Sequence, residues 1–142
     1  MSPAHVLTVA DGAADDRAAR DVARALAAAG TLVASRQVVD PSEAALEPAL
    51  RGPLEGGGLM VVLAEPGGSA GELVPRVVAR LTGARLVLNE RRLALIEASF
   101  AQLGQAMPRR LDRLGLLPKG ALLLPSAPDG WDGWSLAGKN GV

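Results

Sequence analysis

Cysteine is absent from this chain of 142 residues, and histidine occurs once, as His5. The first absence excludes disulfides, thiolate metal sites, iron–sulfur clusters and cysteine nucleophiles together. The second argues against a zinc centre and against a Ser-His-Asp triad, because both need a histidine at a fixed place in a larger constellation. Chemistry in this chain would therefore depend on carboxylates, hydroxyls, arginines and backbone groups.

Long hydrophobic runs are also missing, although apolar residues make up 49% of the chain. No run approaches the roughly 20 apolar residues that a membrane-spanning helix needs. The first residues show no basic region followed by an apolar segment, so we expect no signal peptide, no membrane partner and a cytoplasmic location. A length of 142 residues suits one hydrophobic core. We expect a single domain over 1–142, with 1–4 and 137–142 flexible.

The net charge is zero, with 15 basic and 15 acidic residues, so the composition predicts no nucleic-acid partner. The charged residues are unevenly distributed along the chain. Residues 1–75 carry five Arg against ten Asp or Glu, whereas residues 76–119 carry nine basic residues against three acidic ones. This asymmetry could serve an anionic ligand or complementary faces of an oligomer, and solvated helix faces are the plainer interpretation.

Short apolar runs alternate with helical patterns in the first half of the chain. The runs predict buried strands at His5–Val9, Thr31–Val39 and Leu59–Leu63. Amphipathic spacing and caps predict one helix after Asp15 or Asp16 that ends at Gly30, and another from Ser42 to Leu50. Strands alternating with helices are the signature of right-handed crossovers. The expected fold is α/β, a three-layer αβα arrangement around a doubly wound, mostly parallel sheet.

The second half continues with less regular spacing. Helices are predicted at about 70–81 and 90–103, the latter capped by Asn89, with a further helical stretch at 109–114. Residues 85–88 fit either a short strand or an extended link. Residues 121–124 fit a strand, and 131–136 fit a hairpin arm or edge strand.

Two loops occupy the place where such folds bind ligands, beyond the carboxyl ends of parallel strands. One covers residues 10–13 and the other residues 64–72. The second is rich in glycine and leads into a predicted helix, so backbone N–H groups and the helix dipole could hold an anion there. Its spacing matches neither the dinucleotide fingerprint nor a Walker loop, and a flexible connection is the alternative.

Motifs in the second half resemble a known family. The runs at 100–108, 116–121 and 124–126, with Gly133-Trp134 where Gly-Phe is typical, are similar to the N-terminal domain of CinA-type proteins. That domain belongs to the molybdopterin-binding family, which includes MoaB and Mog. The first strand and the loop at Asp11 agree, so the resemblance covers most of residues 5–137.

The resemblance implies a site for a pterin or nucleotide at the two loops. Asp11 and Glu72 would be the catalytic residues and would hold Mg²⁺, and molybdopterin is the other implied ligand. The ligand contacts that the resemblance implies are Asp11, Gly12, Gly67, Gly68, Ser69, Gly71 and Ser126. For Asp11 a structural role in opening a turn is the alternative, and for Glu72 a favourable interaction with the helix dipole.

The chain also departs from the family pattern. Leu63 and Ala64 stand in place of paired threonines, Glu72 stands where a shorter Asp is typical, and Ser126 replaces an Asn. We therefore expect a domain that binds a pterin or nucleotide phosphate with weak or no catalysis. A CinA-like, Mg²⁺-dependent pyrophosphatase acting on nucleotides of the ADP-ribose type remains an alternative. So does a non-catalytic oligomeric assembly module.

Single residues outside the loops have plainer interpretations. His5 is expected to be a strand-edge residue. The pairs Arg91-Arg92 and Arg109-Arg110 could meet an anionic ligand or a neighbouring subunit, with a solvated face as the default. Trp131 and Trp134 could stack on a planar ring, but filling a core or an interface is more common.

The resemblance predicts self-association, with a trimer favoured, and the charge asymmetry would permit it. The apolar arm at 131–136 adds a physical reason, since an exposed strand edge invites pairing. Light scattering coupled to size exclusion at micromolar protein should give about three times the monomer mass, and a monomer mass would contradict the prediction.

Overall fold

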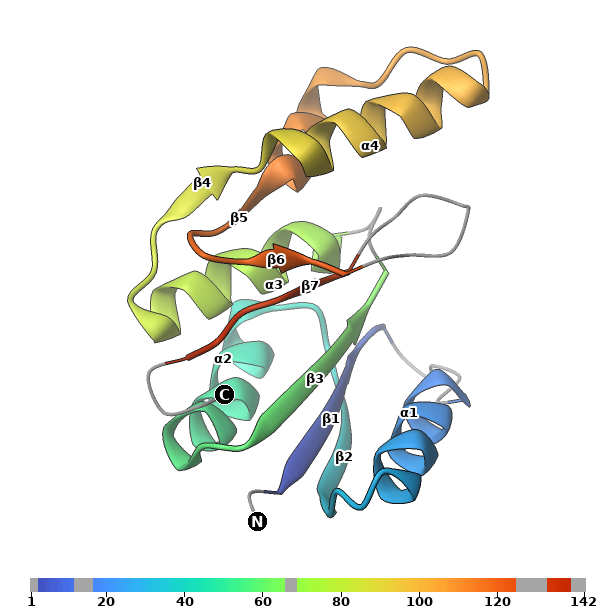
Figure 1. Ribbon diagram of the computed structural model, residues 1–142. Coiled ribbons are helices and arrows are strands. Elements are labelled where there is room, and N and C mark those ends of the chain that lie inside the picture. The colour runs from blue at the N-terminus through green and yellow to red at the C-terminus, as the bar shows by residue number, and fades with distance from the viewer. Residues whose placement is uncertain (1–2, 12–16, 66–68, 125–132, 139–142) are drawn as a thin grey trace.

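The computed structural model describes residues 3–11, 17–65, 69–124 and 133–138. Its first half alternates strand and helix, as the sequence predicted (Figure 1). The elements in order are β1 (Ala4–Val9), α1 (Arg17–Ala28), β2 (Val33–Val39), α2 (Glu43–Gly56), β3 (Leu59–Ala64) and α3 (Ser69–Thr82). The second half contains β4 (Leu86–Leu88), α4 (Glu90–Gln102), the 3₁₀ helix η1 (Arg109–Gly115), β5 (Leu116–Pro118), β6 (Leu122–Leu123) and β7 (Trp134–Ser135).

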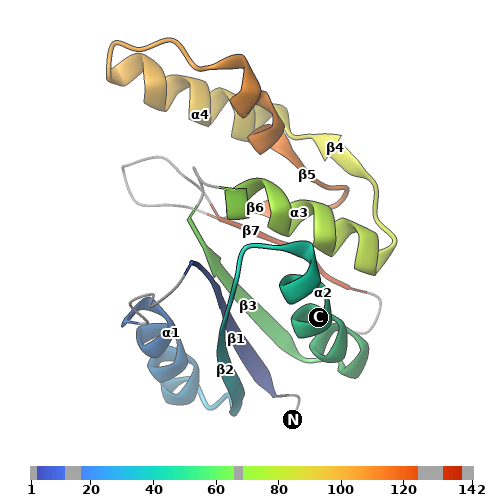
Figure 2. The same ribbon diagram turned by 180° about the vertical axis from the view of Figure 1, so that it is seen from behind.

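The central sheet has three parallel strands in the order β2-β1-β3. Helix α1 lies on one face, and α2 and α3 lie on the other, which gives three layers (Figures 1 and 2). This confirms the predicted αβα class. Among the residues that the structure describes, no helix is long and apolar enough to cross a membrane.

The main core lies between the sheet and the helices α2 and α3. Alternate residues of β1, Leu7 and Val9, point into it, as the twofold periodicity of a strand requires. The other buried members of the cluster come from α2 and α3: Leu46, Leu50, Ala70, Leu73, Val74 and Val77. Trp134 of β7 packs against this cluster, so the more common role expected for a tryptophan applies to it.

Helix α2 begins as predicted and ends later than predicted. The Ser42 hydroxyl caps it by accepting a hydrogen bond from the backbone N–H of Ala45 at 3.2 Å. The helix then continues past Leu50 to Gly56, although it contains Pro48 and Pro53. A proline inside a helix removes a hydrogen bond and costs roughly 3 kcal/mol or more. The apolar stripe continues through Leu54, which is partly buried and packs against the core.

The charge asymmetry of the sequence is partly neutralised inside the molecule. Glu43 of α2 pairs with Arg76 and Arg80 of α3, at 3.1 and 3.4 Å, and Glu47 pairs with Arg80 at 2.6 Å. All of these side chains are partly exposed, so each pair contributes only modestly to stability. The acidic first half and the basic second half thus meet along the α2–α3 contact.

The second half forms a unit that rests on α3. Strand β4 pairs antiparallel with β5, which shows that 85–88 contains a strand. Asn89 caps α4 as predicted, because its side chain accepts a hydrogen bond from the Arg92 N–H at 2.9 Å. The helical stretch at 109–114 is a 3₁₀ helix. Strands β6 and β7, which lie within the predicted strand at 121–124 and the predicted arm at 131–136, form a small antiparallel pair.

Packing of α2 on the sheet should dominate stability. Replacing fully buried Leu50 with Ala removes apolar contacts and leaves a cavity, which typically costs 2–5 kcal/mol. Leu103→Ala is the matched control, because that side chain is 71% exposed. Urea unfolding of both variants measures the difference, and similar losses would contradict the described core.

Candidate functional site

The two loops singled out in the sequence leave the sheet at the same edge. Strands β1 and β3 are parallel neighbours, and Val9 pairs with Ala64 at their carboxyl ends. Asp11 and Glu65, which follow these strands, are both exposed. Helix α3 begins at Ser69, only a few residues after β3. The topology therefore brings the carboxyl end of β1, with Asp11, and the start of α3 to one end of the sheet, as predicted (Figure 2).

Part of the predicted site falls within the described residues. Ser69 begins α3 and Gly71 lies in its first turn, where backbone N–H groups lack partners inside the helix. The loop glycines Gly12, Gly67 and Gly68, and also Ser126, lie outside the described residues. Their predicted contacts with a ligand stay predictions.

Glu72 does not stand alone in the first turn of α3. A guanidinium nitrogen of Arg113, which belongs to η1, lies 3.4 Å from the carboxylate Oε1 of Glu72. The Arg113 side chain is 71% exposed and the Glu72 side chain 39%, so solvent screens the pair. Sequence reasoning missed Arg113 because it lies 41 positions from Glu72. The excess of basic residues in 76–119 was the one available signal.

The described residues contain no preformed cluster of metal-ligating side chains. Mg²⁺ takes oxygen ligands in near-octahedral geometry, and waters or ligand phosphates can supply several of them. Within the described part of the chain, no group of three or more His, Asp or Glu side chains is placed to hold a metal ion. The carboxylate of Glu72 faces the positive charge of Arg113, which would repel a divalent cation. The roles predicted for Asp11 and Glu72 as metal ligands therefore gain no support from this arrangement.

A polar group near the same end of the sheet is buried without a partner. The hydroxyl of Thr8 in β1 is inaccessible to solvent and makes no hydrogen bond among the described residues. Strand alternation places Thr8 on the face opposite Leu7 and Val9, toward α1. Burying this hydroxyl without a partner destabilises the fold. The hydroxyl does not contribute to the predicted ligand site.

Arg92 corrects one sequence-based expectation. A solvated face was the default for Arg91-Arg92, yet only Arg91 is exposed, and Arg92 is 6% exposed. The Nε of Arg92 donates a hydrogen bond to the backbone oxygen of Leu114 at 2.8 Å. This bond ties α4 to η1, the element that carries Arg113. Arg92 thus helps to hold η1, and with it Arg113, in place, although Arg92 is not itself part of the candidate site.

Comparison with solved structures agrees with this architecture. CinA from Thermoplasma acidophilum, a protein described as of unknown function, superposes with a TM-score of 0.76 and 23% identity. The match covers 94% of this chain and 80% of that one. The fold is therefore the three-layer αβα fold of CinA.

Sequence comparison gives relatives with the same name. The chain is 31% identical to a CinA-like protein of Syntrophotalea carbinolica over 128 residues, which is 85% of this chain and 30% of the relative. It is 35% identical to a CinA-like protein of Geobacter sulfurreducens over 113 residues, 80% of this chain and 27% of that protein. No model of a known protein family matches the chain. The chain is thus similar to CinA-like proteins and spans about 30% of their length.

The buried Arg92 should matter for stability where its neighbour does not. Arg92→Met removes the donor to the Leu114 carbonyl, and an orphaned buried acceptor costs roughly 1–3 kcal/mol. Arg91→Met removes the same charge from an exposed position and should change stability by less than about 0.5 kcal/mol. Thermal unfolding of both variants decides the matter, and equal melting temperatures would show that the Arg92 contact is unimportant.

Proposed function

We propose that this chain is a CinA-like domain of the molybdopterin-binding type that holds a small anionic ligand, a pterin or nucleotide phosphate, at the start of α3. In this proposal the ligand is bound with little or no turnover. The observation that carries it is the contact between Glu72 and Arg113, because it pairs the expected catalytic carboxylate with a cation.

Three features at this end of the molecule favour an anion. The first turn of α3 presents unpaired N–H groups and the positive end of the helix dipole. Arg113 adds a full positive charge beside that turn. Since the Glu72–Arg113 pair is exposed, it is worth at most about 1 kcal/mol. A phosphate can therefore compete for the guanidinium, with which it forms stronger charge-assisted bonds.

Weak turnover follows from the residues that would have to act. No group of three or more His, Asp or Glu side chains stands ready to hold a metal ion among the described residues. Leu63 and Ala64 provide no hydroxyl donors, and Glu72 is one methylene longer than the Asp expected from the resemblance. A displacement of about 1 Å can cost roughly 100-fold in rate. Similarity to CinA-like proteins supports the choice of ligand class, and the departures support a binding role.

Glu72→Gln separates the two roles that the residue could have. If Glu72 only neutralises Arg113, the variant frees that cation and should bind ADP-ribose about two- to fivefold more tightly in calorimetry. Glu97→Gln is the control, because it makes the same charge change at an exposed position on α4. Weaker binding by Glu72→Gln alone would contradict the competitive role.

Turnover is measured with the same proteins, Mg²⁺ and ADP-ribose. The proposal expects hydrolysis close to background in the wild type and in both variants. Hydrolysis well above background that disappears only in Glu72→Gln would show a working catalytic carboxylate, and the pyrophosphatase alternative would replace the proposal.

A further inference from the structure

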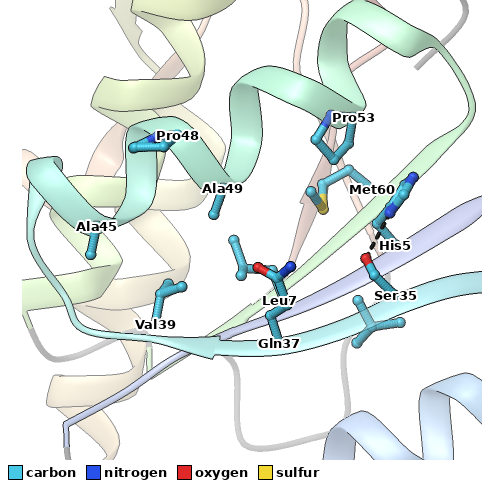
Figure 3. A pocket seen from close by; sticks show the side chains of 11 residues that line it. His5, Leu7, Ser35, Gln37, Val39, Ala45, Pro48, Ala49, Pro53 and Met60 are labelled. Atoms are coloured by element: carbon cyan, nitrogen blue, oxygen red, sulfur yellow. Dashed lines mark hydrogen bonds between the residues drawn. The ribbon is translucent and has the colours of Figure 1, made fainter.

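A groove of about 560 Å³ lies between helix α2 and the strands β1 and β2 (Figure 3). Its floor includes His5, Ser35 and Gln37 on the two strands and Met60 on the neighbouring β3, and its wall on α2 includes Pro48 and Pro53. None of the residues predicted to contact an anion lines it. The volume falls in the range typical of small-molecule sites, which are mostly apolar with a few placed polar groups.

The polar groups on the floor are placed by strand register. His5 of β1 is the direct partner of Ser35 on β2, and the two side chains point to the same face of the sheet. The Nδ1 of His5 and the Oγ of Ser35 are 2.7 Å apart, a good hydrogen bond. The pair is partly buried, and the hydrogen bond fixes the orientation of the imidazole at the groove. His5 is therefore more than the strand-edge residue that the sequence predicted.

Gln37 adds a second kind of recognition. It follows Ser35 by two residues, so it shares the same face of β2, and Figure 3 shows its carboxamide rising toward α2. A carboxamide offers one acceptor and two donors, which match the adjacent N–H and C=O of an amide or lactam. The described lining contains no Lys, Arg, Asp or Glu side chain, so its polar groups suit a neutral ligand.

We propose that this groove binds a small, uncharged molecule with an amide-like edge, which pairs with Gln37 while its apolar body lies against Pro53 and Met60 beside the His5–Ser35 pair. The flexible thioether of Met60 suits such a role, because it adapts its shape to flat ligands. The site is separate from the anion site at the start of α3, and neither proposal depends on the other.

Methyl NMR of protein labelled with ¹³C at the methionine methyl groups tests the proposal. Met60 lines the groove, and Met107 lies outside it and serves as the internal control. The probe is 2-pyridone, a neutral lactam, and its matched control is N-methyl-2-pyridone, in which the lactam donor is blocked. A Met60→Leu variant assigns the signal.

The proposal expects 2-pyridone at millimolar concentration to shift the Met60 methyl signal in a saturable way and to leave Met107 unchanged. The N-methyl probe and the Gln37→Leu variant should each bind about tenfold more weakly, as expected for a lost hydrogen-bonded pair. Gln102→Leu on α4 is the matched variant and should bind as the wild type does. Equal affinity for the two probes, an unaffected Gln37→Leu variant, or no shift at Met60 would each overturn the proposal.

Discussion

Leu7 and Val9 of β1 share one buried cluster with Leu50 of α2 and Val77 of α3, and this packing holds both helices on one face of the sheet. The cluster fixes α3 against the carboxyl end of β3, so the first turn of the helix faces the end of the sheet where ligands bind in such folds. It also fixes α2 over the face of β1, so that a groove is left above β2. One apolar contact between layers thereby sets both proposed sites.

Ion pairs arrange the exposed charged side chains outside the apolar core. Opposite charges along α2 and α3 pair across their contact, and the basic second half supplies Arg113 to the acidic residue at the start of α3. These exposed pairs contribute little to stability, but they decide which groups are available to a ligand. Glu72 is the clearest case, because its partner is a cation of the same chain. In the proposed anion site, a carboxylate and a ligand would thus compete for one guanidinium.

The sequence predicted the elements whose causes are local. Apolar alternation located β1, β2 and β3, and capping side chains located the starts of α2 and α4 at Ser42 and Asn89. Strand and helix order then predicted the layers. Sequence-based prediction failed for elements whose extent depends on packing against a distant part of the chain. Helix α2 continues past Leu50, and Leu54 in this extension packs against the core. Strand β5 forms by pairing with β4.

The same distinction between local causes and distant partners applies to the functional residues. Asp11 and the first turn of α3 could be placed at one edge of the sheet from the strand order alone. The pairing of Glu72 with Arg113 and of His5 with Ser35 could not, since 41 and 30 positions separate the partners. Arg92 was misjudged for a related reason, because its burial depends on η1 packing over α4. Local periodicity carries no information about these contacts.

The central claim is that the site at the start of α3 binds its anion through N–H groups and Arg113, without a metal. Its most direct test is calorimetric titration of the wild-type chain with ADP-ribose, once with Mg²⁺ and once with EDTA. The account predicts the same dissociation constant in both, with affinity falling as salt rises because the contacts are ionic and exposed. Binding that is seen only with Mg²⁺ would contradict it and would show that carboxylates of this chain form a metal centre.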